Sequence, residues 1–108
     1  MLVPTNRRPT SPGKMLLEEF LQPLGLTQTA FAAHAGMTYP RLNAIVNGKR
    51  GITTDTALRF ARALGTSPEF WLNLQLLGEL YDLKHSTKAA EIWRIRRLAK
   101  ALPAKGSK

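Results

Sequence analysis

The sequence predicts an all-α fold of five helices followed by an additional C-terminal amphipathic helix. Apolar residues recur at helical spacing in successive segments, and no segment alternates as a strand does. Residues typical of helix ends separate these segments. Helix-ending glycines follow four of them, and N-capping hydroxyl residues precede five. The glycines are Gly25, Gly36, Gly48 and Gly65, and the capping residues are Ser11, Thr27, Thr38, Thr53 and Ser67.

The positive charge of the chain is concentrated at its two ends. The 108 residues include 16 Lys and Arg against 7 Asp and Glu, yet residues 15–83 are nearly balanced. Residues 84–108 hold eight basic side chains and one acidic side chain, Glu91. Basic ends favour a polyanionic partner such as nucleic acid, although a solubilising tail is the alternative. The absence of cysteine excludes disulfides and thiolate chemistry.

Composition divides the chain into three parts. Residues 1–10 form a flexible basic arm, residues 11–83 one domain, and residues 84–108 a basic helix and tail. No stretch is long and apolar enough for a membrane span, and the N-terminus does not have the pattern of a signal peptide. We therefore expect a bacterial cytoplasmic protein without a membrane partner, associated with the nucleoid when it is bound to DNA.

The first four helices are predicted from their caps and apolar spacing. They span residues 12–22, 28–35, 39–47 and 54–64. Pro12 suits a first helical turn, whereas Pro23 is expected to end the first helix because proline lacks an N–H.

The fifth helix, residues 68–83, is apolar on more than one face. Either it is the central core helix, or it also pairs with a second copy of the chain. The residues expected at such a dimer interface are Phe70, Trp71, Leu74 and Leu77. Gly78 inside this helix indicates a close approach or a break.

The sixth helix is predicted over residues 87–102, with one apolar stripe and basic side chains around it. Its role stays open between packing on the domain or a second subunit, contacting DNA phosphates and binding a protein partner. A membrane-surface role is a weaker alternative.

Residues 28–47 have the pattern of a helix-turn-helix pair. Ala32 is small where the two helices must touch, and Gly36 permits the positive φ of the turn. The interior positions are all apolar, namely Phe31, Ala35, Met37, Leu42 and Ile45. An ordinary helical hairpin is the alternative.

In helix-turn-helix geometry the second helix enters the DNA major groove. Arg41 can donate two hydrogen bonds to guanine, Asn43 can pair with adenine, and small apolar groups can touch a thymine methyl. Arg41 could instead be a solvated surface charge. The predicted base-contacting residues are Thr38, Tyr39, Pro40, Arg41, Asn43 and Ala44. The predicted phosphate-contacting residues are Gln28, Asn47, Lys49 and Arg50.

Several segments resemble the HigA-type antitoxins of the XRE (Cro/repressor-like) helix-turn-helix family. They are PGKMLLEEFLQPLGLTQTAFA (residues 12–32), NGKRGITTDTALRFARALGTSPEFWLNLQ (47–75) and YDLK (81–84). The resemblance implies a five-helix domain that, as a homodimer, represses its own operon at operator DNA. It also implies direct neutralisation of a HigB-type, RelE-like mRNA endoribonuclease. The chain departs from many relatives at Ser11, Lys14 and Pro40 and in its basic C-terminal helix.

The arm and the first helix are the predicted toxin surface, because they lie away from the recognition helix and offer acidic groups to a basic toxin. The residues concerned are Arg7, Arg8, Met15, Glu18 and Glu19. No nucleophile motif, phosphate loop or metal-ligand spacing is present, so we expect no enzymatic activity, cofactor or metal. A transcriptional repressor of the same family without a toxin partner is the alternative function.

Overall fold

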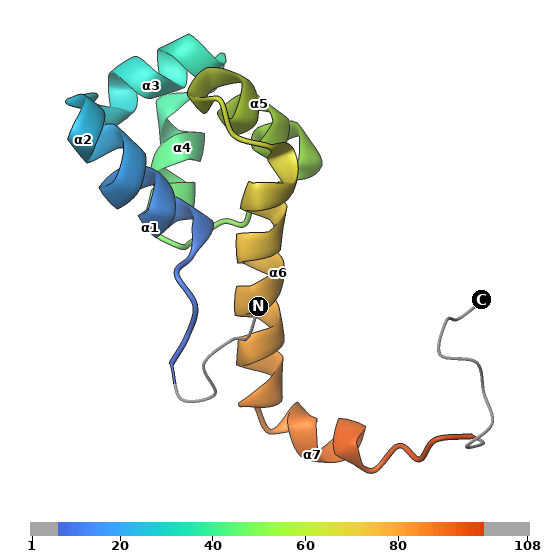
Figure 1. Ribbon diagram of the computed structural model, residues 1–108. Helices are drawn as coiled ribbons and strands as arrows, with labels where there is room; N and C mark the ends of the chain where they lie inside the picture. The colour runs from blue at the N-terminus through green and yellow to red at the C-terminus, as the bar shows by residue number, and fades with distance from the viewer. Residues whose placement is uncertain (1–6, 99–108) are drawn as a thin grey trace.

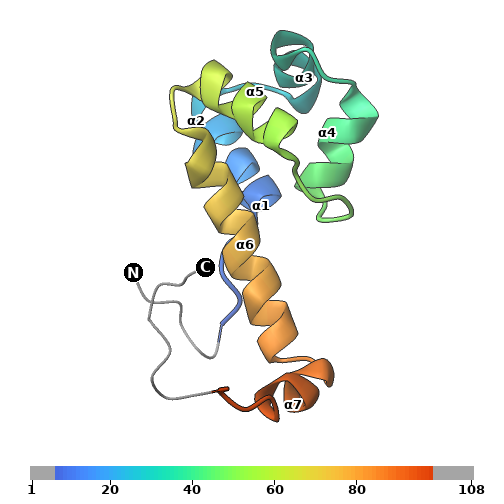
Figure 2. The ribbon, with the colours of Figure 1, turned by 90° about the vertical axis from the view of Figure 1, so that its right-hand side faces the viewer.

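The computed structural model describes residues 7–98, and within them all regular structure is helical (Figure 1). The elements in chain order are α1 (Pro12–Leu16), η1 (Leu17–Leu21), α2 (Gln22–Leu24), α3 (Gln28–Ala35), α4 (Tyr39–Val46), α5 (Thr54–Leu64), α6 (Pro68–Lys84) and α7 (Lys88–Trp93). Helices α1 to α5 gather around the N-terminal half of α6, whose C-terminal half projects from the bundle and carries α7 (Figures 1 and 2). No helix in this part of the chain has the length and apolar character needed to cross a bilayer.

The first helix is longer than predicted, because Pro23 does not end it. Residues 12–24 form one continuous helical rod, with a π-helical turn, η1, between α1 and α2. In this turn the Gln22 N–H donates to the Leu17 carbonyl, five residues back. The wider turn shifts the carbonyls that would face the proline ring, so Pro23 continues the helix for a further turn. The rod ends at Gly25, whose φ is 68°.

The helix-turn-helix pair has the predicted boundaries to within one residue. Helix α3 is capped by the Thr27 hydroxyl, and α4 by the Thr38 hydroxyl, which accepts from the Arg41 N–H at 3.3 Å. Gly36 forms the turn with φ 73°, a conformation that favours glycine. Ala32 is buried between the two helices. The predicted crossing contact, turn and caps are therefore all confirmed.

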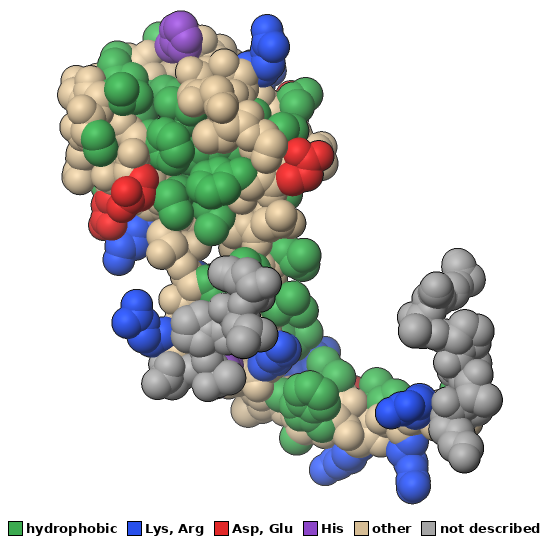
Figure 3. Space-filling view, viewed as in Figure 1, with side chains coloured by type: hydrophobic (Ala, Val, Ile, Leu, Met, Phe, Trp, Pro, Cys, Tyr) green, Lys and Arg blue, Asp and Glu red, His purple; other side chains and the backbone are tan. Residues whose placement is uncertain are grey.

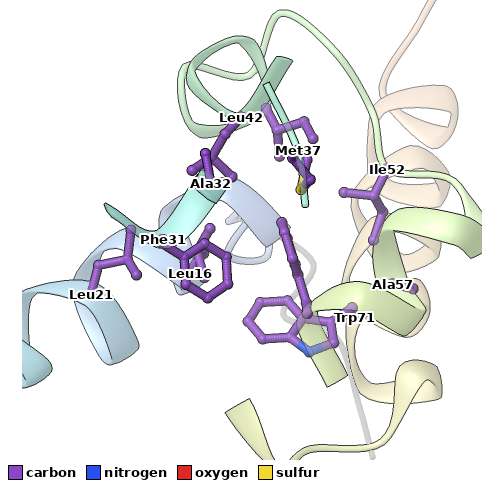
Figure 4. Packing of buried hydrophobic residues seen from close by; sticks show 11 residues of the cluster. Leu16, Leu21, Phe31, Ala32, Met37, Leu42, Ile52, Ala57 and Trp71 are labelled. Atoms are coloured by element: carbon purple, nitrogen blue, oxygen red, sulfur yellow. The ribbon is translucent and has the colours of Figure 1, made fainter. Parts of the chain in front are cut away.

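Trp71 of α6 lies at the centre of the hydrophobic core (Figure 4). Its ring centroid lies 5.1 Å from that of Phe60 and 5.3 Å from that of Phe20, and Phe60 in turn stacks edge-on against Phe31. The indole N–H donates to the Thr66 hydroxyl at 2.6 Å, so this buried polar group is paired. One aromatic cluster thereby joins the first rod, α3, α5 and α6.

Helix α1 packs directly on the backbone of α4 at Gly13. A Cβ atom at position 13 would overlap the Ile45 carbonyl oxygen and lie 2.8 Å from the Val46 Cα. Backbone atoms cannot turn aside as a flexible side chain can. The absence of a side chain at Gly13 therefore sets how closely the first rod approaches the recognition helix.

Helix α6 has two opposite apolar faces, and only one of them lies against the core. The predicted dimer set was wrong for Trp71, which is fully buried in its own protomer. Phe70 and Leu74 also pack against the core. Their spacing places these residues on the inner face.

The open face of α6 consists of Leu76, Leu80 and Leu83, which are 52%, 42% and 40% exposed. These side chains recur every three or four residues, so they lie on one side of the helix. Apolar side chains gather along the projecting half of α6 and over α7 (Figure 3). We call Leu76, Leu80 and Leu83 the outer leucine face.

The N-terminal arm is attached to α6 by Arg8. Its guanidinium donates to both carboxylate oxygens of Asp82, at 2.8 and 2.9 Å. The Nη2 atom of the same guanidinium lies 3.0 Å from the position that a Cβ on Gly78 would occupy. Gly78 therefore marks the close approach of a side chain rather than a break, and it is buried beneath Arg8. Residues 1–6 of the predicted arm lie outside the described residues.

The last helix is much shorter than predicted. Helix α7 ends at Trp93, residues 94–98 are not helical, and residues 99–102 of the predicted helix lie outside the described residues. Ala89 of the predicted stripe is buried, but Ile95 and Leu98 are 75% and 92% exposed. A short helix depends on tertiary packing of its apolar face, and within residues 7–98 these two side chains are left mostly exposed. Repulsion between Arg94 and Arg97, which would be neighbours three residues apart on a continued helix, opposes a further turn.

The contact at Gly13 predicts a specific stability defect. Gly13→Ala should lower the free energy of unfolding by about 1–3 kcal/mol, because the new methyl group overlaps the α4 backbone. Thermal unfolding followed by circular dichroism measures this effect. Gly25→Asn is the matched control, because that position is open and left-handed, and asparagine tolerates this conformation. Equal melting temperatures for Gly13→Ala and the wild type would contradict the prediction.

Candidate nucleic-acid interface

Helix α4 presents a polar surface on the side opposite its buried residues. Leu42 and Ile45 are buried in the core, whereas Thr38, Tyr39 and Pro40 are exposed at the helix start. Since Pro40 occupies the first turn, its missing N–H removes no helical hydrogen bond. The N-cap and the first two residues of α4 are therefore exposed at the end where base readers are expected.

A chain of amide side chains joins α3 to α4. Asn43 donates from Nδ2 to Gln28 Oε1 at 3.0 Å, and Asn47 donates from Nδ2 to Asn43 Oδ1 at 3.1 Å. The three residues lie at the start of α3, in the middle of α4 and at its C-cap. The predicted base reader Asn43 is thus held in place by the predicted phosphate contacts on both sides.

Arg41 is bound to α5 and is not the freely solvated charge that one interpretation allowed. Its Nη2 donates to the Thr56 hydroxyl at 2.6 Å and lies 3.6 Å from Asp55 Oδ1. Thr56 is itself buried, with a relative exposure of 1%. Because these contacts all use Nη2, the Nε and Nη1 donors remain for a ligand.

Asp55 lies between two guanidiniums. Arg59 donates from Nε to Asp55 Oδ1 at 2.7 Å, and the Nη1 of Arg59 donates to the Ala35 carbonyl at 3.0 Å at the end of α3. The hydrogen bond from Arg59 is the main cause that lowers the pKa of the Asp55 carboxyl, and the charges of Arg59 and Arg41 lower it further. Asp55 therefore stays ionised at neutral pH.

The loop after α4 carries the predicted phosphate contacts Lys49 and Arg50, both exposed. Gln75 of α6 fixes this loop by accepting from the Ile52 N–H at 2.5 Å and donating to the Ile52 carbonyl at 2.9 Å. A Cβ at Gly51 would lie 2.8 Å from the Gln75 amide oxygen. The partly buried amide of Gln75 thus fixes the backbone of the loop that follows the recognition helix.

Sequence reasoning missed Asp55, Thr56, Arg59 and Gln75. The four-residue spacing of Asp55 and Arg59 on one helix is a recognisable pairing signal. Gln75 gives a second signal, because it shares a helix face with Trp71 and Gly78, and a polar group on a packed face needs a partner. The contact of Arg41 with Thr56 has no such signal, because it depends on the angle between α4 and α5.

The residues predicted to face a toxin do not share one environment. Glu18 and Glu19 are exposed on η1, and acidic side chains gather over this part of the first rod (Figure 3). Met15 is partly buried against the core. Arg7 is exposed, while Arg8 is paired with Asp82. Among residues 7–98 no three His, Asp or Glu side chains come together as a metal site would require.

Comparison with known proteins identifies the family. Residues 17–71 match the family model described as Helix-turn-helix. The chain is 42% identical to the antitoxin HigA-1 of Vibrio cholerae over 81 residues, which covers 75% of this chain and 76% of that protein.

Solved structures agree with this match and confirm the predicted Cro/repressor-like fold. The antitoxin GraA has a TM-score of 0.79 and 36% identity, covering 86% of this chain and all of GraA. The Pseudomonas aeruginosa antitoxin HigA, solved with the higBA promoter, has a TM-score of 0.78 and 34% identity, covering 85% of this chain and all of that one. The chain belongs to the XRE helix-turn-helix family and, within it, to the HigA-type antitoxins.

Proposed function

We propose that this chain is the antitoxin of a type II toxin–antitoxin system. It binds and neutralises a HigB/RelE-like mRNA endoribonuclease, and as a dimer it binds operator DNA and represses its own operon. The observation that carries the DNA-binding half is α4, which presents a polar, exposed N-terminal end on a domain that belongs to the HigA-type family.

Two features of the site support operator binding. Thr38, Tyr39 and Pro40 are exposed at the end of α4 that would enter the major groove, and Lys49 and Arg50 are exposed on the next loop, where they would meet the flanking phosphates. In addition, the antitoxin GraA has been solved in complex with its operator, with a TM-score of 0.78 and 35% identity to this chain.

The toxin-binding half rests on family membership and on charge. A ribonuclease toxin has to bind polyanionic RNA, so its surface is basic at the active site. The exposed carboxylates Glu18 and Glu19 on the first rod complement such a surface. Arg7, Arg8 and Met15 lie on the neighbouring arm and α1, so we place the toxin contact on the first rod and the arm. This surface adjoins the recognition helix, because α1 packs on the α4 backbone at Gly13.

The dimer rests on the outer leucine face of α6. Together with Ile92 and Trp93 of α7, which are 36% and 69% exposed, this face leaves apolar side chains in water, and a groove of about 150 Å³ lies between α6 and α7. A two-fold axis through this surface pairs identical patches. To read two adjacent half-sites, the recognition helices of such a dimer must lie about one DNA turn, roughly 34 Å, apart.

Co-expression tests the toxin half. The chain should co-purify with the product of a small reading frame adjacent to its own gene, through a tag on that product. Expression of that product alone should arrest growth. A repressor without a toxin partner predicts neither a complex nor toxicity while DNA binding remains.

Substitutions in the interface test the DNA half. Lys49→Ala and Arg50→Ala should weaken binding to the upstream duplex and to a scrambled duplex equally, and each should reduce the salt slope by about one. Asn43→Ala should instead reduce the preference for the upstream duplex by about 1–3 kcal/mol. Fluorescence anisotropy at several salt concentrations separates the two effects. An unchanged preference in Asn43→Ala would contradict its assignment to base reading.

A charge on the outer leucine face tests the dimer. Leu80→Glu should weaken association at least about 100-fold, because an unpaired carboxylate would be buried at the interface. Leu58→Glu is the matched control, since Leu58 is also exposed, at 54%, but lies on α5. Sedimentation equilibrium at micromolar concentration should give a monomer for the first variant and a dimer for the second. A wild-type monomer with and without operator DNA would exclude the dimer.

A further inference from the structure

We propose that Asp55 is a specificity-determining positioning residue: it holds Arg41 and Arg59 at the edge of the DNA interface and suppresses binding to non-operator DNA. The proposal rests on the DNA-binding function proposed above, and it assigns a role to an acidic residue of α5 within that interface.

Asp55 lies beside two guanidiniums at the edge of the recognition helix. It lies in the first turn of α5, and its Oδ1 lies 2.7 Å from Arg59 Nε and 3.6 Å from Arg41 Nη2. One carboxylate oxygen thus serves two guanidiniums from two helices. Since Arg41 projects from the recognition helix, Asp55 borders the surface that faces DNA.

The side chains of Arg41 and Arg59 are both held in place by contacts that include Asp55. Arg41 is anchored at Nη2 by both Thr56 and Asp55, and the side chain is 29% exposed. Arg59 is anchored by Asp55 and by the carbonyls of Ala35 and Gly36, at 3.0 and 3.3 Å. The carboxylate therefore restricts the orientation of Arg41, while Arg59 ties α5 to the turn of the helix-turn-helix pair.

The negative charge of Asp55 lowers the affinity of this surface for phosphate groups. Sequence-independent DNA affinity comes from cations that neutralise phosphates and release counterions. Asp55 satisfies part of the charge of Arg41 and Arg59 internally, and its own charge repels an approaching phosphate. A surface with this carboxylate therefore gains less binding free energy from a phosphate backbone than the same surface without it.

Restricting the position of Arg41 increases the selectivity for matching base pairs. A guanine edge offers two acceptors to one guanidinium, whereas a misaligned base offers fewer. Only a site that matches the restricted position of Arg41 gains the full set of hydrogen bonds. A repulsive element of this kind increases the difference between right and wrong partners without adding a contact to the right one.

The test compares Asp55→Asn with Glu69→Gln. Both variants remove one carboxylate from the first turn of a helix, but Glu69 lies at the start of α6, beyond the far end of α5. The probes are a duplex of the DNA directly upstream of the gene and a scrambled duplex of the same composition. Fluorescence anisotropy is measured between 50 and 300 mM salt on full-length protein, and circular dichroism verifies the fold.

We expect Asp55→Asn to bind the scrambled duplex about five- to tenfold more tightly at 100 mM salt, with a salt slope steeper by about one. Its preference for the upstream duplex should fall by a similar factor. Glu69→Gln should change both quantities less than twofold, and Asp55→Glu should restore the wild-type values.

Weaker binding of Asp55→Asn to both duplexes, or the same response as Glu69→Gln, would overturn the proposal. A wild-type protein that does not prefer the upstream duplex would overturn autorepression instead. In that case the affinity for the scrambled duplex and the salt slope of this affinity would still test the role of Asp55. A wild-type protein that binds neither duplex would exclude both the DNA-binding function and the role of Asp55.

Discussion

The recognition helix depends on the contact between Gly13 and the backbone of Ile45 and Val46. Helix α4 has eight residues, and a helix of this length is marginal in water without tertiary packing. Its buried side chains, Leu42 and Ile45, give it one apolar attachment. The close approach at Gly13 gives it a second attachment, on the backbone itself, from a rod far away in sequence. With both attachments the polar face of α4 needs no packing of its own and is left for a ligand.

Polar contacts then fix the edges of the same surface. The amide chain through Asn43 joins α3 to α4, Arg59 joins α5 to the turn, and Gln75 holds the loop at Ile52. Each of these bonds connects elements that the hydrophobic core already brings together. They fix orientation more than they add stability, because a hydrogen bond within a protein replaces one to water and so contributes only a modest net free energy. The core sets the approximate arrangement of the helices, and these side chains refine it where DNA would be read.

Local features of the structure were predictable from sequence, and angular ones were not. Thr27, Thr38 and Gly36 define helix ends through interactions within a few residues, so their roles follow from the sequence alone. Pro23 misled because a π-helical turn, formed several residues earlier, made room for its ring. The apolar pattern of α6 predicts two faces without showing which one meets the core, so it wrongly places Trp71 at an interface. Arg41 was correctly placed on α4, but its partner Thr56 depends on how α5 crosses it.

Helix α6 connects the proposed dimer contact to the proposed DNA-binding surface, because one of its faces packs on the core and the opposite face is open to a second copy. Trp71 and Gln75 on the core side determine where α5 and the loop at Ile52 lie, and through them how α4 is presented. The outer leucine face, on the opposite side, is where a second copy would bind. In such a dimer α6 of each protomer would fix the position of its recognition helix relative to the interface, because Gln75 and Leu76 lie on different sides of one continuous helix. The spacing of the operator half-sites would then follow from the packing of α6 within each protomer as much as from the contact between protomers.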